Sequence, residues 1–335
     1  MKKPSLLFVL LALITIQLAY AQGKKSEFKV LKMIPVEGNT GWDYLTVDKA
    51  GQRLFVSHGT CVEVVDLKTD KSIGQIPNTP GVHGIALVPS LNKGFITAGR
   101  IDSVIVFDMK TLKVLDKIKT GKNPDAILYD AFTNRIFTFN GRDNSITAID
   151  PKTNRVAGTM PVSGKPEAAV SNGKGKIFCN IEDKSTVVKF DALTLKQEAE
   201  WPLDPGKGPS GLDMDVKTNR LFSACSDSKQ IVVMNADNGK IVATLPMGDR
   251  CDGIVFIPAG RYAVSSNGDG TATIVQGDGP DQYKVVQTLE TRKSARTITY
   301  DETTGRIYMS SAEVNMDNGK RSVVPGSFKI VVVSK

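Results

Sequence analysis

The chain has 335 residues, of which 41% are hydrophobic and 23% are charged, a balance that is typical of a globular core and argues against disorder. The formal net charge is +8, but the basic residues are scattered through turns, so nucleic acid is a weak candidate partner. Four cysteines in a chain of this length argue against a scaffold built on disulfides.

The first 21 residues have the pattern of a secretory signal peptide. Lys2 and Lys3 form a positive head, residues 6–18 are almost purely apolar, and residues 19–21 (Ala-Tyr-Ala) place small residues at a cleavage site. The apolar run is too short and too early for a stable span, and no later stretch approaches the ~20 apolar residues of a transmembrane helix. We expect cleavage before Gln22 and a soluble protein in the periplasm or outside the cell.

The rest of the chain repeats two short phrases with a period of 41 to 45 residues. The first phrase is an apolar run that ends on an acidic or amide residue before a turn. Its six copies end at Asp66, Asp108, Asp150, Asp191, Asn235 and Gln276. The second phrase is a basic or small residue followed by two mostly apolar residues. Its seven copies begin at Arg53, Gly94, Arg135, Lys176, Arg220, Arg261 and Arg306.

Each repeat contains four short apolar segments separated by turn residues. In the third repeat these segments are 126–129, 136–139, 146–149 and 156–160. Segments of this length that are rich in Val, Ile and Phe and bounded by Asp, Asn, Thr and Gly are typical of strands. Runs without alternation, such as residues 104–107, indicate a sheet stacked between two others. Four strands at this period predict a β-propeller.

The last repeat is one strand short. It contains residues 297–300, 307–310 and 329–333, while the strand-like residues 28–34 precede the first complete repeat. Because a propeller must hide its terminal edges, we expect residues 28–34 to pair with residues 328–334. The predicted fold class is therefore all-β: a single seven-bladed β-propeller domain over residues 22–335, with four-stranded antiparallel blades and a ring closed by pairing of the N-terminal strand with the C-terminal strand.

Three segments carry a resemblance to a known family. Residues 136–140 (Ile-Phe-Thr-Phe-Asn), 145–150 (Ser-Ile-Thr-Ala-Ile-Asp) and 166–170 (Pro-Glu-Ala-Ala-Val) resemble the YVTN-type repeat of the YncE-like β-propellers, and the resemblance extends over essentially the whole mature chain. It implies the propeller fold. It implies no single activity, because related propellers include binding proteins, lactone-cleaving enzymes, metal-dependent lyases and quinone- or haem-bearing oxidoreductase domains.

One position in each repeat predicts a ring of side chains around the central channel. The innermost strand of each blade lines the channel and begins at one mouth, which we call the funnel. The seven aligned positions, called the ring residues, are Asp43, His83, Asp125, Glu167, Ser210, Asp252 and Arg296. Small residues follow several of them and let the strands converge, whereas the ring position is free to carry chemistry. We therefore expect the ring residues to bind a ligand.

Carboxylates this close repel one another and need a partner. The candidates are Arg296, protonated His83, a metal ion or a cationic ligand. Oxygen ligands with one imidazole suit Ca²⁺, Mg²⁺ or Mn²⁺, and a histidine pair would admit Zn²⁺. The candidate metal ligands are Asp125, Glu167, Asp252 and His83. The alternative is a water-filled channel whose charges are solvated or paired with Arg296.

Both histidines of the chain are expected on the funnel face. His58 ends the second strand of the first blade, and His83 begins the first strand of the next. A histidine near Asp43 and Asp125 is suited to bind metal or to act as a general base. His83 is the candidate catalytic residue because His58 lies further from the axis. The alternative is that the two histidines share this face by chance.

An insertion and a cysteine pair are expected near the same face. Residues 312–326 separate the second and third strands of the last blade, and we expect this segment to hang over the funnel as a lid. Cys225 and Cys251 belong to neighbouring blades and are the candidate disulfide in an oxidising compartment. Buried free thiols are the alternative. Cys61 is isolated, and no cysteine spacing indicates a metal site.

The sequence leaves the activity open. It has no Gly-x-Ser-x-Gly elbow, phosphate-binding loop or His-Glu-x-x-His motif. We predict an exported monomeric propeller that binds a small molecule or a protein partner through the funnel. The alternative is a metal-assisted hydrolase or lyase, similar to a lactonase, in which ring carboxylates hold the ion and His83 moves a proton.

Overall fold

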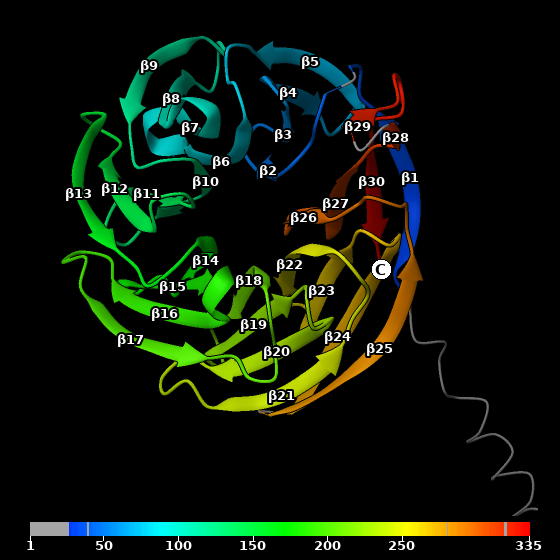
Figure 1. Cartoon of the computed structure of the whole chain (residues 1–335). Helices are drawn as coiled ribbons and strands as arrows, with labels where there is room; N and C mark the ends of the chain where they lie inside the picture. Colours follow the sequence, from blue (N-terminus) through cyan, green and yellow to red (C-terminus); the bar gives the residue numbers. More distant parts are fainter. Residues whose placement is uncertain (1–26, 39, 280, 318–319) are drawn as a thin grey trace, which may run out of the picture.

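The computed structural model describes residues 27–38, 40–279, 281–317 and 320–335. The expected signal peptide and its cleavage site before Gln22 lie outside the described residues. Within them the strands form seven four-stranded antiparallel sheets around a central axis (Figure 1). The predicted seven-bladed propeller is confirmed.

The first six blades run outwards from the axis in chain order. The first blade contains β2 (Leu45–Asp48), β3 (Arg53–His58), β4 (Cys61–Asp66) and β5 (Lys71–Ile76). The second contains β6 (Val82–Val88), β7 (Lys93–Ala98), β8 (Ser103–Asp108) and β9 (Val114–Lys119). The third contains β10 (Pro124–Asp130), β11 (Arg135–Asn140), β12 (Ser145–Asp150) and β13 (Arg155–Pro161).

The next three blades repeat this order. The fourth contains β14 (Pro166–Ser171), β15 (Lys176–Ile181), β16 (Thr186–Asp191) and β17 (Gln197–Pro202). The fifth contains β18 (Pro209–Asp215), β19 (Arg220–Cys225), β20 (Gln230–Asn235) and β21 (Ile241–Pro246). The sixth contains β22 (Cys251–Ile257), β23 (Tyr262–Asn267), β24 (Thr271–Gly279) and β25 (Gln282–Glu290).

The seventh blade closes the ring as the sequence predicts. Its order is β26 (Thr297–Asp301), β27 (Arg306–Ser311), β30 (Lys329–Ser334) and β1 (Lys29–Pro35). β1 and β30 are antiparallel, with Lys29 opposite Ser334 and Pro35 opposite Lys329, and they lie side by side in Figure 1. The outer edge of the last blade is therefore covered by the start of the described chain.

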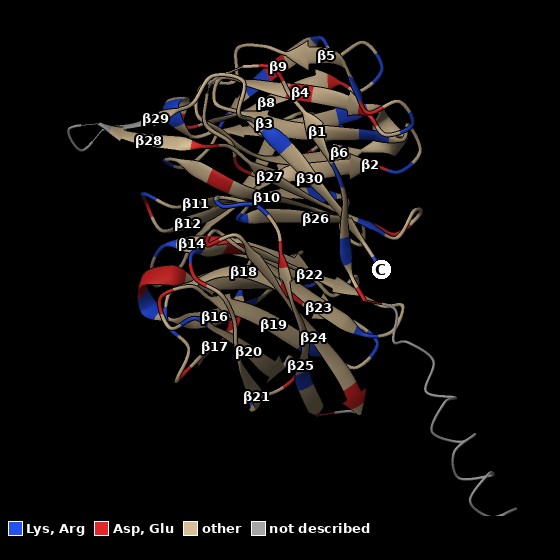
Figure 2. Cartoon of the chain, turned by 90° about the vertical axis from the view of Figure 1, so that its right-hand side faces the viewer, with Lys and Arg blue, Asp and Glu red and all other residues tan. Residues whose placement is uncertain are grey.

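A few short elements lie in the loops that connect the strands of the blades. Two short strands, β28 (Val314–Asp317) and β29 (Lys320–Val323), pair with each other and project beyond the blades on one face (Figure 2). Three 3-10 turns, η1 (Pro89–Leu91), η2 (Gly99–Ile101) and η3 (Glu182–Lys184), connect strands. In the described part of the chain, no helix is long and apolar enough to span a membrane. Figure 2 also shows basic and acidic residues interspersed over the molecule.

Each blade packs its two faces against its neighbours. The middle strands are buried on both faces, which explains their unbroken apolar runs. Aromatic rings meet between adjacent blades: Phe55 lies 5.5 Å from Phe107, and Phe222 lies 5.3 Å from Phe256, measured between ring centroids. The hydrophobic core is therefore distributed as a series of interfaces between blades, and a blade is stable only in the company of its neighbours.

Small residues let the innermost strands converge at the axis. A Cβ atom added to Gly211 of β18 would lie 2.9 Å from the backbone of Gly253 in β22, closer than side chains can approach. The small residue after the ring position is thus a requirement of the channel, as the sequence predicts. This close approach brings the ring residues of neighbouring blades together.

Aspartates in the outer hairpins have structural roles. Asp66 Oδ1 accepts hydrogen bonds from the Lys68 and Thr69 amides and from the Thr69 hydroxyl. These bonds, led by the one from the Thr69 amide, lower the pKa of Asp66. The repeated Asp-x-x-Thr phrase therefore builds turns.

Candidate functional site

The ring residues stand where the innermost strands begin, and most of them lie in β-bulges. A shift in strand register brackets the ring residue in five blades. The five residues are His83, Asp125, Glu167, Ser210 and Asp252. A bulge takes a residue out of the ladder and re-aims its side chain, here towards the axis. Asp43 and Arg296 lie just before β2 and β26.

The chain reaches most ring positions through a left-handed residue. Two positions before the ring residue, the backbone φ lies between 53° and 69° in five blades, at Gly81, Asn123, Gly208, Arg250 and Ser294. Glycine and asparagine adopt this conformation readily. The sharp turn carries each connection from the outer strand of one blade into the channel strand of the next.

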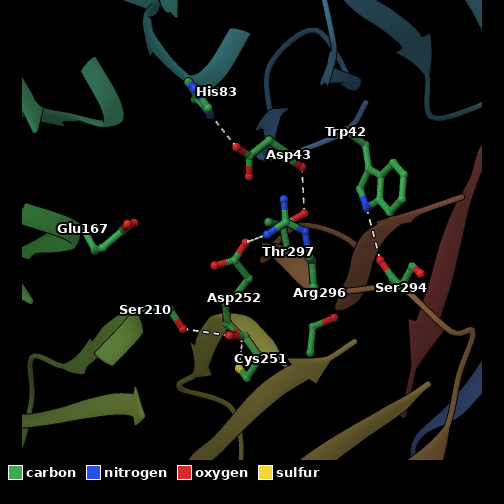
Figure 3. Close-up of polar contacts among 12 residues, drawn as sticks. Trp42, Asp43, His83, Glu167, Ser210, Cys251, Asp252, Ser294, Arg296 and Thr297 are labelled. Atoms are coloured by element: carbon green, nitrogen blue, oxygen red, sulfur yellow. Dashed lines mark hydrogen bonds and ion pairs between the residues drawn. The ribbon is translucent and has the colours of Figure 1, made fainter. Parts of the chain in front are cut away.

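Hydroxyl groups from neighbouring blades hold the ring backbone in place. Thr97 Oγ1 donates to the Asp125 carbonyl at 2.6 Å, and Thr297 Oγ1 donates to the Asp43 carbonyl at 2.7 Å. Ser210 Oγ donates to the Cys251 carbonyl at 2.8 Å (Figure 3). Ser210 therefore differs from the other ring residues, because its side chain is uncharged and donates to the backbone of the next blade.

Asp43, His83 and Asp125 form a compact cluster. His83 Nδ1 lies 2.7 Å from Asp43 Oδ2 and 3.6 Å from Asp125 Oδ1, and one ligand atom from each residue lies within 4.8 Å of the others. Burial favours the neutral imidazole, but the hydrogen bond with Asp43 and the charges of Asp125 and Asp43 outweigh it and raise the pKa of His83. Burial also raises the pKa of Asp125 to about 7, a rise that His83 opposes.

The other two carboxylates have their own cations. Arg296 Nη1 donates to Asp252 (Figure 3), and Lys165 Nζ lies 2.5 Å from Glu167 Oε1 while it also pairs with Glu182. Burial raises the pKa of Asp252 to about 6 against the effect of Arg296, and burial with the charge of Asp125 raises that of Glu167.

The carboxylates converge as the sequence predicts, but they do not form one metal set. Burial raises the pKa of Tyr44, and the charges of four carboxylates add to the rise: Asp125, Glu167, Asp43 and Asp252. Carboxylates from four different blades therefore lie close enough to act on the hydroxyl group of one tyrosine. Figure 3 shows the labelled ring side chains facing a common centre. The predicted metal ligands Glu167 and Asp252 are neutralised by protein cations, whereas Asp43 joins His83 and Asp125.

A cavity of about 1020 Å³ opens at one side of the ring, and we call it the funnel cavity. Ser210, Asp252 and Arg296 are the ring residues in its wall. Its other charged residues are Glu182, Asp227, Arg250, Arg292, Lys293 and Glu313. A cavity of this size can enclose a small organic molecule.

The β28–β29 hairpin forms one wall of the funnel cavity. Val314, Asn315 and Met316 line it, and Arg292 Nη2 pairs with Glu313 at 3.1 Å at the base of the hairpin. The hairpin projects beyond the blades (Figure 2), so the described residues place the predicted insertion beside the funnel cavity. Its closure as a lid stays a prediction.

The candidate Cys225–Cys251 disulfide is not formed in this structure, in which all four cysteines, each within the described residues, are free, as in the alternative that the sequence left open. Cys225 Sγ contacts the Ser223 carbonyl at 3.7 Å, and Cys251 Sγ contacts the Gly253 carbonyl at 3.3 Å. Each thiol thus turns to a carbonyl of its own chain segment. Burial raises the pKa of both thiols to about 12, which keeps them protonated.

Four contributors to the site, Lys165, Arg250, Tyr44 and Trp42, are not among the candidate residues of the sequence analysis. Lys165 lies two positions before Glu167, and Arg250 lies two positions before Asp252, so a basic residue at that offset was the available signal. Tyr44 follows Asp43 and lines a cavity of about 210 Å³ inside the channel. Trp42 is buried, and its Nε1 donates to the Ser294 carbonyl at 3.1 Å, which joins the first and last blades (Figure 3).

Comparisons with known proteins show the fold. No family model and no curated protein matches the sequence. Among solved structures, a chain of Kuenenia stuttgartiensis hydrazine synthase is similar with a TM-score of 0.72 and 16% identity, over 87% of this chain and 97% of that chain. U3-55K and the RRP9 WD40 repeats each match with a TM-score of 0.74 and 10% identity, over 92% of this chain and 98% of theirs. At these identities the likeness establishes a seven-bladed β-propeller and says nothing of activity.

Proposed function

We propose that this chain is an exported propeller that binds a small polar ligand bearing an anionic group in the funnel cavity. The charges of the cavity wall carry the proposal. Arg296 and Arg292 are paired with Asp252 and Glu313, whereas Arg250 and Lys293 form no ion pair among the described residues. A carboxylate or phosphate group is the natural partner for two such cations.

The rest of the wall fits a polar ligand. Ser226, Thr291 and Ser294 supply hydroxyl groups, and the Thr291 hydroxyl is buried without a hydrogen-bond partner within the described residues. Asp227 also lines the cavity and has no ion pair there, so the wall can meet a hydroxyl or amino group as well as an anion. Sugar acids, sugar phosphates and amino acids combine these features.

The test is a thermal-shift and calorimetric screen of small carboxylates, sugar acids, sugar phosphates and amino acids. A hit should lose at least about tenfold in affinity in the Arg250→Ala, Lys293→Ala double variant, about 1.4 kcal/mol of binding free energy. The matched control is Lys174→Ala, because Lys174 lines a different cavity. Equal affinity in the double variant and the wild type would contradict the proposed site.

Export and kinship belong to the same proposal. The signal-like residues 1–21 support export, and the mass of the protein recovered from the periplasm or medium should then correspond to a chain that starts at Gln22. The repeat phrases support kinship with the YncE-like propellers. A full-length chain confined to the cytoplasm would contradict export and leave the binding proposal intact.

The Asp43–His83–Asp125 cluster favours a second candidate, a metal-assisted hydrolase or lyase. Two carboxylates and an imidazole fit Mg²⁺, Mn²⁺ or Ca²⁺. A bound ion would supply Lewis-acid polarisation of a carbonyl such as that of a lactone. His83 Nδ1 faces both Asp43 and Asp125, so the imidazole is already turned towards the two carboxylates with which it would share the ion.

Metal analysis after loading with Mn²⁺ tests this candidate. Asp125→Asn should reduce the bound metal, whereas Glu167→Gln should retain it, because Lys165 already neutralises Glu167. Lactone hydrolysis that is lost with EDTA and in Asp125→Asn would establish the enzyme. Metal retained in Asp125→Asn, or activity that resists EDTA, would exclude it.

A further inference from the structure

A second cluster of ligand-type side chains lies in the first blade, away from the ring residues. His58 ends β3 and Cys61 begins β4, and the two residues face each other across a tight hairpin. Glu63 is two residues further along β4, so its side chain leaves the sheet on the same face as that of Cys61. One ligand atom from each of the three residues lies within 4.8 Å of the others.

The histidine of this cluster has an unmet hydrogen-bonding group. His58 is only 2% exposed, and its Nδ1 is buried with no hydrogen-bond partner within the described residues. The other ring nitrogen, Nε2, lies 3.4 Å from the Thr40 amide nitrogen. A buried nitrogen without a partner is costly and rare in native proteins, and a bound ion is one of its explanations.

The Glu63 carboxylate accepts hydrogen bonds but forms no ion pair with a basic side chain among the described residues. Glu63 is 9% exposed. Gln75 Nε2 donates to Glu63 Oε1 at 2.7 Å, and Ser72 Oγ donates to Glu63 Oε2 at 3.1 Å. A buried carboxylate that keeps its charge normally has a paired charge or a metal beside it.

We propose that His58, Cys61 and Glu63 form a Zn²⁺ site. An imidazole nitrogen, a thiolate sulfur and a carboxylate oxygen are the three donor types that Zn²⁺ takes in proteins. The thiolate disfavours Ca²⁺ and Mg²⁺, which prefer oxygen ligands. Three protein ligands leave one tetrahedral position for water.

Neighbouring polar groups are placed to orient the ligands. Gln75 Nε2 donates to Cys61 Sγ at 3.1 Å as well as to Glu63, so one amide bridges two of the three ligands. Ser72 holds the second carboxylate oxygen of Glu63. Such second-layer hydrogen bonds are characteristic of metal sites.

The site is placed to strengthen ring closure. The His58 ring packs against Phe328, with 4.5 Å between ring centroids, and Phe328 directly precedes β30. Thr40 Oγ1 donates to the His58 carbonyl at 3.0 Å, and Thr40 lies between the closing strand β1 and the first blade. An ion on His58 would therefore fix a residue that already contacts both chain segments that close the ring.

Cobalt substitution tests the proposal with a readout specific for sulfur. The full chain without its signal peptide, purified in the reduced and metal-free state, should bind one Co²⁺ with a thiolate-to-cobalt charge-transfer band in the near ultraviolet. Zn²⁺ should displace the Co²⁺ and abolish the band. The oxygen-rich cluster at Asp43, His83 and Asp125 cannot produce this band, so the result is independent of the proposed function.

Variants identify the ligands. Cys61→Ser should lose the band and weaken Zn²⁺ binding by at least about 100-fold, more than the loss of a second-layer partner. Glu63→Gln should keep the band and weaken Zn²⁺ binding. Cys225→Ser is the matched control and should behave as the wild type, because no described histidine forms a ligand cluster with Cys225. No band in the wild type, or a band that persists in Cys61→Ser, would overturn the proposal.

Discussion

His83 Nδ1 and Asp43 Oδ2 belong to neighbouring blades and lie 2.7 Å apart at the channel mouth. This contact should be visible in the titration of His83. In the metal-free protein with a chelator present, Asp43→Asn should lower the pKa of His83, because the hydrogen bond and charge that favour the imidazolium are lost while burial still opposes it. The chain has two histidines, so an NMR pH titration follows each imidazole separately.

Glu167→Gln is the control for that titration, because Glu167 is paired with Lys165. It should leave the pKa of His83 near the wild-type value. A His83 pKa unchanged by Asp43→Asn would show that the two side chains do not interact in solution.

The Arg296–Asp252 pair should contribute to stability. Arg296→Gln leaves the Asp252 carboxylate without its cation, and we expect a loss of about 1–3 kcal/mol in the free energy of unfolding. This is less than for a fully buried pair, because the two side chains keep 33% and 27% of their surface exposed. The added substitution Asp252→Asn should recover at least half of the loss in urea unfolding.

An exposed ion pair supplies the comparison. Lys49 pairs with Glu302, and both side chains are more than half exposed. Lys49→Gln should change stability by less than about 0.5 kcal/mol. Equal effects of Lys49→Gln and Arg296→Gln would argue against a special role for the ring pair.

Ring closure depends on the buried face of β1. Ile34 is 1% exposed and packs with Leu54 and Val332, so Ile34→Ala should cost about 2–4 kcal/mol in denaturant unfolding. Met33, the preceding residue, is 43% exposed, and Met33→Ala should cost less than about 0.5 kcal/mol. Similar costs for the two variants would mean that β1 does not pair in the register described.

The ionisation of Asp213 should lower the free energy of unfolding as the pH rises. Burial raises the pKa of its carboxyl to about 6 from an ordinary value of 3.8, although the Phe256 and Met214 amides donate to it at 2.6 and 2.8 Å, and Glu302 adds to the rise. The pKa of Asp213 is therefore higher in the folded state than in the unfolded state. Its contribution to the free energy of unfolding is complete at pH values below the pKa in the unfolded state, and it is lost as the pH rises through about 6.

The variant Asp213→Asn should remove this pH dependence. Between pH 4 and pH 7 the wild type should lose up to about 3 kcal/mol more stability than the variant, since each pKa unit corresponds to about 1.4 kcal/mol. The measurement is urea unfolding at several pH values, and any fixed cost of the substitution appears as a constant offset. Parallel pH profiles for the two proteins would show that Asp213 titrates normally.

The repeat in the sequence predicts the architecture and the ring because both depend on period and register. Residues such as Asp125 and Glu167 occupy equivalent positions in successive repeats. Because the blades are related by rotation about the channel axis, equivalent positions lie at the same end of the channel. Closure by residues 28–34 follows from the missing strand of the last unit. These predictions needed the order of elements but no knowledge of side-chain contacts.

The pairing of charges could not be predicted in this way. Whether Glu167 faces a metal ion or Lys165 depends on bulge geometry and on which way two long side chains turn, and the sequence left both a metal ion and a protein cation open as partners. Likewise, the position of Cys225 and Cys251 on neighbouring blades does not determine the direction of their Sγ atoms, and the candidate disulfide is not formed.

The sequence by itself determined a seven-bladed ring with an acidic mouth, because strand period and turn chemistry are local properties of the chain. Only the tertiary structure decided which charges meet, since contacts such as that of His83 with Asp43 join residues on different blades at ångström precision. It also brought His58, Cys61 and Glu63 together, because strand pairing across a hairpin places them on one face, although the sequence shows Cys61 isolated from the other cysteines.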